Sequence, residues 1–463
     1  FPIPNSPFPI PNSPFPIPNS LNSVTQTYQQ QINNPTQTKK WLNWLPLFGW
    51  LPFALAINSF IIPPGTAIAY WGRWIGLIFL TIYGFNKVFI SGKWQRNNFD
   101  RFAFLVFIVI IISTAYADLN GVLYAADFYQ TGILKAVSFL LAYLFLTWGV
   151  QSVLNSFDDA SAIIQNLVYS ATVIYTVGLI GNGLRVIPVL MGAPSGIFFN
   201  PNATAALGII ILPLSIWFSS RHKSWGIFRF FPTLIIFTAI IISGARTPLF
   251  AGIILLLYYL ICRSRSKGIE MLIIYSMLTI FISALLILSI DFWSSSLFDK
   301  LYESLTTSTD AGITSYRTNL LWPLFIEKIF SSPISILIGN GWGSEEALLL
   351  HKSSQSIVFE RLWVGTAHNA YLGLTYQIGL IGSLLTFFPL WSVVINQIKD
   401  SANYINKEHF EFKLALCSAL LAELCLCVFE SGFYNIGSAH SLPGWLVAYI
   451  AVKLPYLQTD CKY

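Results

Sequence analysis

Long apolar stretches recur along most of this 463-residue chain, and they constrain its fold more than any other feature. A helix rises about 1.5 Å per residue, so about 20 apolar residues cross the ~30 Å hydrocarbon core of a bilayer. Twelve stretches near this length lie at residues 43–62, 70–90, 102–117, 133–150, 162–180, 203–219, 230–243, 247–262, 270–290, 369–391, 411–432 and 440–454. We therefore expect an all-α polytopic membrane protein with about twelve transmembrane helices.

The composition supports this class and excludes several others. Charged residues make up 10% of the chain and hydrophobic residues 55%, whereas a soluble domain carries roughly 25% charged residues. A cytosolic enzyme, a nucleic-acid-binding protein and a secreted disulfide scaffold could not keep so much apolar surface from water. The net charge of +6 is typical of basic cytoplasmic loops in membrane proteins. The five cysteines form neither a disulfide framework nor a paired metal-binding motif.

The two ends of the chain differ from its apolar middle. Residues 1–40 open with a seven-residue Phe-Pro-Ile-Pro-Asn-Ser-Pro repeat and continue rich in Gln, Asn and Thr. Proline at this density prevents a helix, so we expect a disordered cytoplasmic tail. The transmembrane domain is predicted at residues 41–454 and a short cytoplasmic tail at residues 455–463. Because the sequence opens with Phe1 rather than Met, we expect the natural start to lie upstream.

The positions of lysine and arginine predict the orientation of the spans, because cytoplasmic loops carry the excess of these residues. With the N-terminus inside, most of them fall on the inner side: Lys39, Lys40, Lys93, Arg96, Arg101, Arg221, Lys223, Arg229, Arg263, Arg265, Lys267, Lys399, Lys407 and Lys413. The connection between spans four and five is an exception, since it holds Asp158 and Asp159 and no basic residue. Both termini are predicted to be cytoplasmic. A loop of about 80 residues between spans nine and ten, residues 291–368, is predicted to be periplasmic.

Ionisable residues within membrane spans are rare and informative. Glu423, in the predicted span at 411–432, is the one carboxylate expected midway through a span. A coupled transporter would be expected to carry more such groups and broken helices at mid-membrane. Polar residues gather instead at the predicted outer ends of the spans. This distribution suits a substrate whose lipid tail lies in the bilayer and whose head group protrudes.

Two short patterns lie at predicted outer span ends before the long loop. Asn200-Pro201-Asn202 opens the sixth span, where Asn202 could simply cap a helix. Arg246 lies between Gly244, which allows a tight turn, and Pro248, which favours the first turn of a helix. An arginine held there could anchor the helix at the interface or bind a phosphate through its planar fork.

Three further patterns lie in the long loop and at its end. Tyr316-Arg317, followed by Leu321-Trp322, begins an amphipathic segment that we expect to lie along the membrane surface. Residues 339–343 read Gly-Asn-Gly-Trp-Gly, which could cradle a ligand or only turn the chain. His368-Asn369-Ala370-Tyr371 opens the tenth span. There the histidine could be functional, or it could cap or pack the helix.

In this order, these patterns resemble the O-antigen ligase and polymerase superfamily, most densely over residues 195–390. The resemblance implies a C-type glycosyltransferase architecture in the bacterial inner membrane. It also implies transfer of a preassembled glycan from an undecaprenyl diphosphate carrier to an acceptor hydroxyl, with no metal ion or other cofactor. The acceptor is the lipid A core in ligases, a growing chain in polymerases and a protein in relatives. Ligase is narrowly favoured over polymerase, and a small-anion transporter, for example of bicarbonate, is the alternative from another class.

The resemblance also implies residue roles. The family's arginines correspond to Arg246 and Arg317 and its histidine to His368, which are the expected catalytic residues. Two arginines could stabilise a diphosphate leaving group, and a neutral imidazole could take the proton of the attacking hydroxyl. A single displacement of this kind inverts the anomeric centre. Substrate-binding roles are expected for Arg185, Asn202, Asn369, Tyr371 and Glu430, of which Glu430 could orient an arginine or the histidine.

Overall fold

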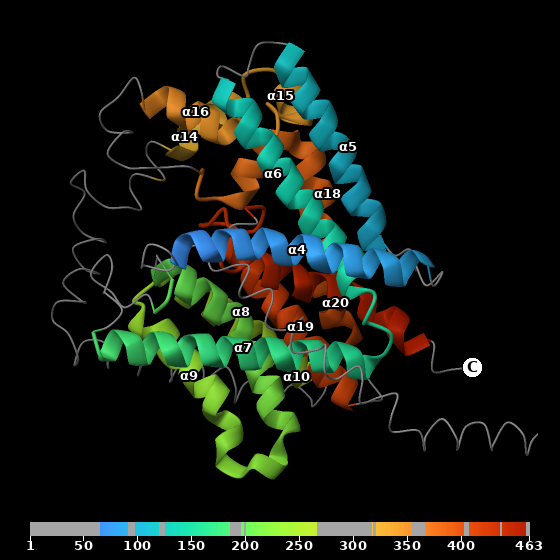
Figure 1. Cartoon of the computed structure of the whole chain (residues 1–463), viewed down its shortest axis with the longest axis vertical. Coiled ribbons are helices and arrows are strands. Elements are labelled where there is room, and N and C mark those ends of the chain that lie inside the picture. Colours follow the sequence, from blue (N-terminus) through green and yellow to red (C-terminus); the bar gives the residue numbers. More distant parts are fainter. Residues whose placement is uncertain are drawn as a thin grey trace, which may run out of the picture. The chain divides into compact units, whose positions relative to one another are not determined.

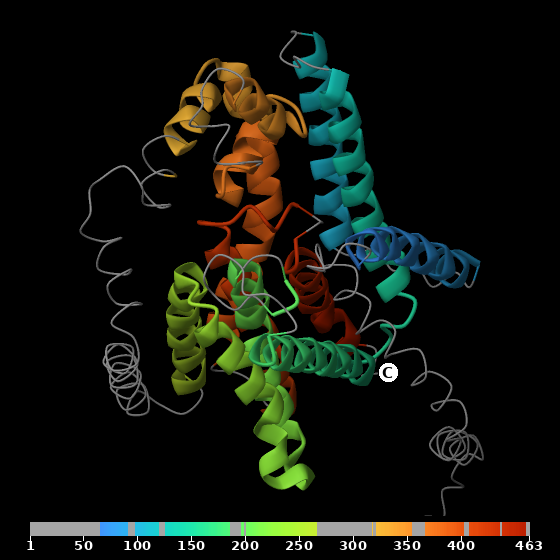
Figure 2. The same cartoon turned by 60° about the vertical axis from the view of Figure 1, so that its left-hand side comes forward.

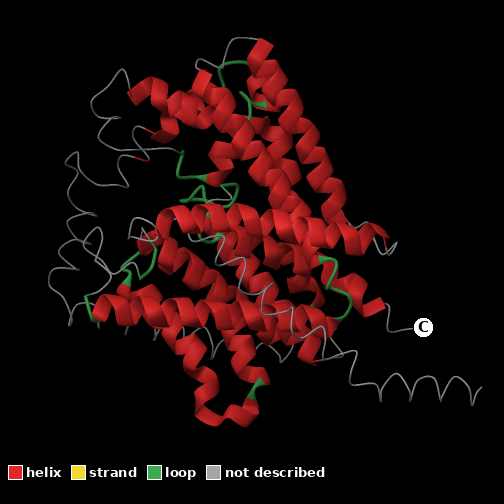
Figure 3. Ribbon diagram, in the orientation of Figure 1, coloured by secondary structure: helices red, strands yellow, loops and turns green. Residues whose placement is uncertain are grey.

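The computed structural model describes residues 65–90, 98–119, 126–185, 196–198, 201–265, 317, 321–353, 366–401, 407–435 and 438–459. Every secondary-structure element within these ranges is a helix (Figure 3), which confirms the all-α class for the described part of the chain. The predicted N-terminal tail, the spans at 43–62 and 270–290 and the start of the long loop lie outside the described residues.

The helices are labelled in Figure 1. The first group comprises α4 (Gly65–Ile90), α5 (Asn98–Leu119), α6 (Ala126–Leu144), the π-helical η1 (Phe145–Val150), α7 (Phe157–Gly183), α8 (Pro201–Arg221), the 3-10 segment η2 (Lys223–Phe230), α9 (Phe231–Ile242) and α10 (Arg246–Arg265). The second comprises α14 (Trp322–Ile329), α15 (Pro333–Ile338), α16 (Ser344–Ser353), α18 (Ala370–Asp400), α19 (Lys407–Leu426) and α20 (Ser441–Thr459). Five described helical stretches are long and apolar enough to cross a membrane: Phe99–Leu119, Phe157–Gly183, Pro201–Arg221, Lys223–Ile242 and Ala370–Asp400. The chain is thus a multi-pass helical membrane protein by length and composition, while the number twelve stays a prediction.

The two aspartates that broke the charge pattern have clear local roles at the start of α7. Ser156 and Asp159 form a capping box, in which each side chain accepts a hydrogen bond from the backbone N–H of the other, at 3.2 and 3.0 Å. Asp158 lies 3.7 Å from Arg221 at the end of α8. Arg221 in turn forms a 2.7 Å ion pair with Glu408 in the first turn of α19. The connection between spans four and five, which carries no basic residue, therefore lies beside Arg221, which was predicted to be cytoplasmic.

More of the predicted inner charges gather at this same end of the helices. Arg263, near the end of α10, pairs with Glu411 at 3.3 Å, and Lys413 pairs with Asp400 at the end of α18 at 3.1 Å. Partly exposed pairs of this kind contribute little stability, but they show which helix ends lie together. From Glu411 to Leu426, α19 rises about 22 Å, most of the ~30 Å hydrocarbon core. The starts of α10 and α18 consequently lie with the end of α19, far from these charges.

The three short helices of the long loop gather around the first half of α18 (Figures 1 and 2). One apolar side of α14 packs inward against α18, while the expectation that this segment lies along the membrane surface stays a prediction. Phe325 is fully buried, and its ring meets the ring of Tyr376 of α18 at a centroid distance of 5.1 Å. Leu321 and Ile329 are buried in the same cluster, because this side of α14 finds an apolar partner on α18.

A break in α18 receives the glycine-rich turn. Gly379 has a φ of 68°, outside the helical region, which interrupts the helix. The backbone N–H of Asn340 donates to the carbonyl of Tyr376 at 2.8 Å, and that of Gly341 donates to the carbonyl of Gln377 at 3.0 Å. The break thus lets α18 accept hydrogen bonds from outside the helix. Glycine is required because a Cβ at position 379 would collide with the facing backbone of α15.

Candidate functional site

Three of the predicted site residues meet where α18 begins and α19 has ended. Glu430 Oε1 lies 3.6 Å from Arg317 Nη2, and Glu430 Oε2 lies 3.7 Å from His368 Nδ1. Arg317 Nη2 also lies 3.4 Å from His368 Nδ1, and Arg317 Nη1 donates to the carbonyl of Phe429 at 2.8 Å. We call Arg317, His368 and Glu430 the Arg–His–Glu cluster. It joins three segments that are far apart in the sequence.

The cluster is largely shielded from solvent. The side chains of Arg317 and Glu430 are 11% and 16% exposed, whereas that of His368 is 33% exposed. Burial by itself raises the pKa of Glu430, but the nearby His368 and the charge of Arg317 outweigh it and hold the pKa below its ordinary value. Glu430 is thus a carboxylate that faces both cluster partners. Since Nδ1 of His368 faces these partners, Nε2 is the nitrogen left for a ligand.

The backbone around His368 holds the residue in an uncommon conformation. Its φ of 49° lies in the left-handed region, which costs a residue with a Cβ about 1–2 kcal/mol. On one side, Trp322 Nε1 donates to the carbonyl of Ala367 at 3.1 Å. On the other side, Asn369 caps α18, because its Oδ1 accepts from the N–H of Leu372 at 3.0 Å. Contacts on both sides therefore hold the backbone at His368 in this conformation.

The end of α19 differs from the sequence prediction. The predicted span continued to residue 432, but α19 ends at Leu426, so Glu423 lies in its last turn rather than midway. The N–H of Ala370 at the start of α18 donates to the carbonyls of Cys427 and Glu430, at 2.7 and 3.2 Å. The chain leaves the helix because these carbonyls are used by a neighbouring helix start instead of by a further turn.

Glu423 also has a buried partner close to the cluster. Nδ1 of His440, just before α20, lies 2.9 and 3.0 Å from the two oxygens of Glu423. Both side chains are nearly inaccessible, at 6% and 0% exposure. The carboxylate predicted midway through a span is therefore paired with His440, at the same end of α19 as the Arg–His–Glu cluster.

Arg246 is the first residue of α10, and its side chain lies outside the described residues. The backbone position is nonetheless informative. One turn later, the ring of Phe250 meets the ring of Phe429 edge to face, at a centroid distance of 6.4 Å. Because the carbonyl of Phe429 binds Arg317, α10 begins beside the cluster.

The remaining predicted residues occupy different positions. Arg185 follows α7 with a φ of 57° and is exposed, and Asn202 lies in the first turn of α8. The hydroxyl of Tyr371 donates to the carbonyl of Leu424 at 3.0 Å and accepts from Trp391 Nε1 at 3.1 Å. Tyr371 is therefore engaged between α18 and α19. Asn369 caps α18 beside the cluster.

The glycine-rich turn is fully used by the protein itself. Besides the two bonds to α18, the N–H of Trp342 donates to Thr114 Oγ1 at 3.1 Å, and that of Gly343 donates to Gln377 Oε1 at 2.7 Å. The N–H of Ser344 donates to the carbonyl of Gly341 at 3.2 Å. A phosphate cradle needs free N–H groups. Of the two alternatives for residues 339–343, the structure therefore favours a turn of the chain over a ligand cradle.

Sequence reasoning did not find two partners of the cluster. The carbonyl of Phe429 binds Arg317, and a backbone acceptor leaves no signal in the sequence. Trp322 was noted only as part of a pattern, although its indole N–H holds the residue before His368. Its place in the Tyr-Arg-x3-Leu-Trp pattern after Arg317 was the available signal.

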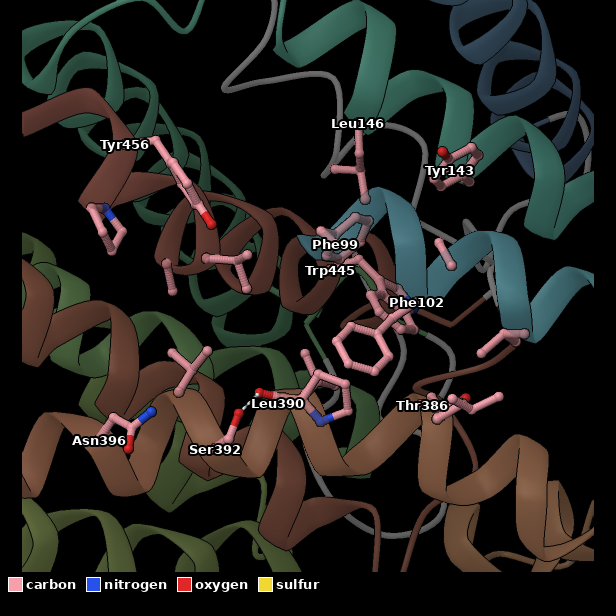
Figure 4. A pocket seen from close by; sticks show the side chains of 18 of the residues that line it. Phe99, Phe102, Tyr143, Leu146, Thr386, Leu390, Ser392, Asn396, Trp445 and Tyr456 are labelled. Carbon is pink, nitrogen blue, oxygen red and sulfur yellow. Dashed lines mark hydrogen bonds between the residues drawn. The ribbon is translucent and has the colours of Figure 1, made fainter. Parts of the chain in front are cut away.

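A cavity of about 350 Å³ lies elsewhere, between α5, α6, α18 and α20 (Figure 4). Its walls are mainly apolar and include Phe99, Phe102 and Trp445. It follows α18 to Asp400 and reaches Lys413, the end of the helices that carries the ion pairs. The cavity is thus separate from the Arg–His–Glu cluster.

The fold and the cluster together define a multi-pass helical membrane protein with a shielded arginine, histidine and carboxylate at one end of its helices. Residues 231–387, about a third of the chain, match the family model described as O-antigen ligase. This confirms the resemblance seen in the sequence and supports glycan transfer of the ligase or polymerase type. The match contains Arg246, Arg317 and His368, whereas Glu430 lies beyond it. A search of curated proteins found no match.

Proposed function

We propose that this protein transfers a preassembled glycan from undecaprenyl diphosphate to an acceptor hydroxyl at the periplasmic face of the bacterial inner membrane, with inversion and without a metal ion. The observation that carries the proposal is the Arg–His–Glu cluster, which lies at the junction of three segments and includes two residues within the O-antigen ligase match. It offers a cation for a phosphate and a base for a hydroxyl within one site.

The leaving group explains the need for arginine. As the bond between the anomeric carbon and the diphosphate breaks, negative charge grows on the phosphate oxygens. A guanidinium can stabilise that charge through two parallel hydrogen bonds. Arg317 is held on one side by the carbonyl of Phe429, which limits its freedom, and Arg246 starts the helix beside it. The carrier chain would remain in the bilayer.

The histidine would act on the acceptor. The hydroxyl oxygen attacks the anomeric carbon, and its proton passes to Nε2 of His368, which requires the other proton to be on Nδ1. Glu430 Oε2 lies 3.7 Å from Nδ1, and a small approach would let it accept a hydrogen bond from this N–H, which keeps its proton. An arginine can only donate, so the 3.4 Å contact of Arg317 with Nδ1 fits the opposite tautomer. Movement of Arg317 onto the donor diphosphate would free Nδ1 for Glu430.

The lipid A core, as in a ligase, is the acceptor we propose, with a growing glycan chain, as in a polymerase, as the alternative within the same superfamily. Both reactions make the same demands on the cluster. A small-anion transporter would use the arginines to attract an ion but has no need for a histidine backed by a carboxylate. We therefore favour transfer over transport.

The test is reconstitution of the purified protein in liposomes with an undecaprenyl diphosphate glycan, with and without lipid A core, in the presence of a chelator. We expect inverted glycan on the lipid A core in wild type and a strong loss in His368→Ala. His222→Ala is the matched control, since His222 contacts Phe218 and Trp225 next to η2 and should leave transfer unchanged. Chain extension without lipid A core would identify a polymerase. Anion flux without any transfer would refute the proposal.

A further inference from the structure

A buried carboxyl group outside the proposed chemistry is linked to the histidine segment. Glu345, in the first turn of α16, is completely inaccessible to solvent. Its Oε2 accepts a 2.6 Å hydrogen bond from the hydroxyl of Tyr434 and a 3.0 Å bond from Gln377 Nε2. Its Oε1 accepts from the backbone N–H of Ala367, the residue directly before His368.

Each donor belongs to a segment that shapes the site. Ala367 precedes His368, and Tyr434 lies four residues after Glu430 in the turn that follows α19. Gln377 belongs to the α18 segment that receives the glycine-rich turn, and its Oε1 accepts from the N–H of Gly343 at 2.7 Å. That bond fixes the amide orientation, so Nε2 is the end that faces Glu345.

The chemical character of this pocket matches a carboxylate acceptor. Tyr434, Gln377 and Ala367 all present donors to Glu345. The pKa of Glu345 is raised, because its burial outweighs the opposing effects of the charge of Lys135 and the bonds from Tyr434 and Ala367. A carboxylate with three donors has most of its lone pairs satisfied.

Gly373 of α18 gives independent evidence for the contact between Tyr434 and Glu345. A Cβ on Gly373 of α18 would overlap the hydroxyl of Tyr434 and would lie 3.2 Å from Glu345 Oε1. Only a residue without a side chain leaves the space in which Tyr434 and Glu345 meet. The approach of α16 to α18 is therefore built around this contact.

We propose that Glu345 is a positioning residue, which sets His368 against Glu430 by binding the N–H of Ala367 and the hydroxyl of Tyr434 at once. Its catalytic consequence rests on the proposed glycan transfer. Ala367 is fully buried, so its N–H would have no acceptor if the carboxyl were removed. The segment would then turn to find a new partner, and the left-handed conformation of His368 would be lost.

Glu345→Gln keeps the size of the side chain but places a donor group among donors. We expect kcat for transfer to fall by about tenfold or more, since small displacements of reacting groups cost at least that much, while donor affinity is retained. Glu327→Gln is the matched control, because the side chain of Glu327 is 71% exposed on α14 and pairs with the adjacent Lys328. It should leave kcat unchanged.

A double-mutant cycle separates positioning from general destabilisation. If Glu345 acts through His368, Glu345→Gln should lower kcat in wild type and have no further effect in His368→Ala. Equal fold-losses in the two backgrounds would overturn the proposal. Tyr434→Phe removes one donor and keeps the ring, and it provides the same cycle if Glu345→Gln fails to fold.

Hydrogen exchange gives a readout that is independent of activity. In the full-length protein, Glu345→Gln should speed exchange in the peptide that contains residues 366–372, whereas Glu327→Gln should not. Unchanged exchange there would overturn the positioning role even if transfer is lost. Faster exchange in a protein whose wild type transfers no glycan would retain the positioning role and refute the proposed function.

Discussion

Gly379→Ala tests how far the break in α18 depends on a missing side chain. The φ of 68° at Gly379 costs an alanine about 1–2 kcal/mol. The new Cβ would also overlap the backbone of Leu337 and Ile338, and α15 could withdraw only by losing the two hydrogen bonds from Asn340 and Gly341 to α18. At about 0.5–1.5 kcal/mol for each bond, the total loss is about 2–5 kcal/mol.

The assay is thermal unfolding of the purified protein in detergent. Gly379→Ala should lower the apparent Tm by several degrees. Gly183→Ala is the matched control, because Gly183 ends α7 and a Cβ there meets nothing within 4 Å. Replacing a helical glycine in open space should be neutral or slightly stabilising.

An apparent Tm for Gly379→Ala equal to that of Gly183→Ala would refute this reasoning. It would mean that α18 can close its break at little cost, and that the glycine-rich turn is held by contacts other than its bonds to α18. Reduced protein yield with an unchanged Tm would also count against it, since the argument concerns the folded state.

Four further outcomes are expected. His368→Ala should lower turnover by about 10²–10⁴ if the imidazole is a general base, with donor binding retained in a binding assay. Arg317→Lys should reduce transfer sharply and Arg317→Ala further, because lysine keeps the charge but loses the planar fork. The pKa of Glu430 is lowered, so its contribution to stability is complete above the ordinary glutamate pKa and is lost progressively as the pH falls from there through the lowered value. In pH-dependent unfolding, the advantage of wild type over Glu430→Gln should therefore be full at neutral pH and shrink from the ordinary glutamate range downward. A cysteine at Ser353 should react with an impermeant thiol reagent applied from outside, and one at Ser224 should not; the reverse would place the cluster on the cytoplasmic side.

The sequence predicted the helical class because a membrane span has a strong compositional signal. It predicted the end of α19 less well, since Cys427, Val428 and Phe429 continue the apolar run beyond Leu426. What ends α19 is the use of the Cys427 and Glu430 carbonyls by Ala370. That contact joins segments about sixty residues apart and has no local pattern.

In the site as well, residues within a local sequence pattern were predicted, whereas contacts between distant segments were not. Arg317 and His368 carried recognisable neighbours, and the structure brings them together with Glu430. Glu345 was missed, although it follows the glycine-rich motif closely, because only the folded chain shows that its carboxyl group reaches Ala367. Arg185 could not be tied to a motif, and it is exposed in the structure.

A carboxylate already neutralises Arg317 before any substrate arrives. A phosphate group that binds this guanidinium exchanges one anionic partner for another, so the affinity reflects the difference between the two contacts rather than the full strength of the new one. In the proposed transfer, the spent polyprenyl carrier would bear the same diphosphate as the donor, and tight retention of it would stall turnover. Glu430 would pair with Arg317 again as this product departs, so the residue proposed to support the base would also compete with the product and speed its release.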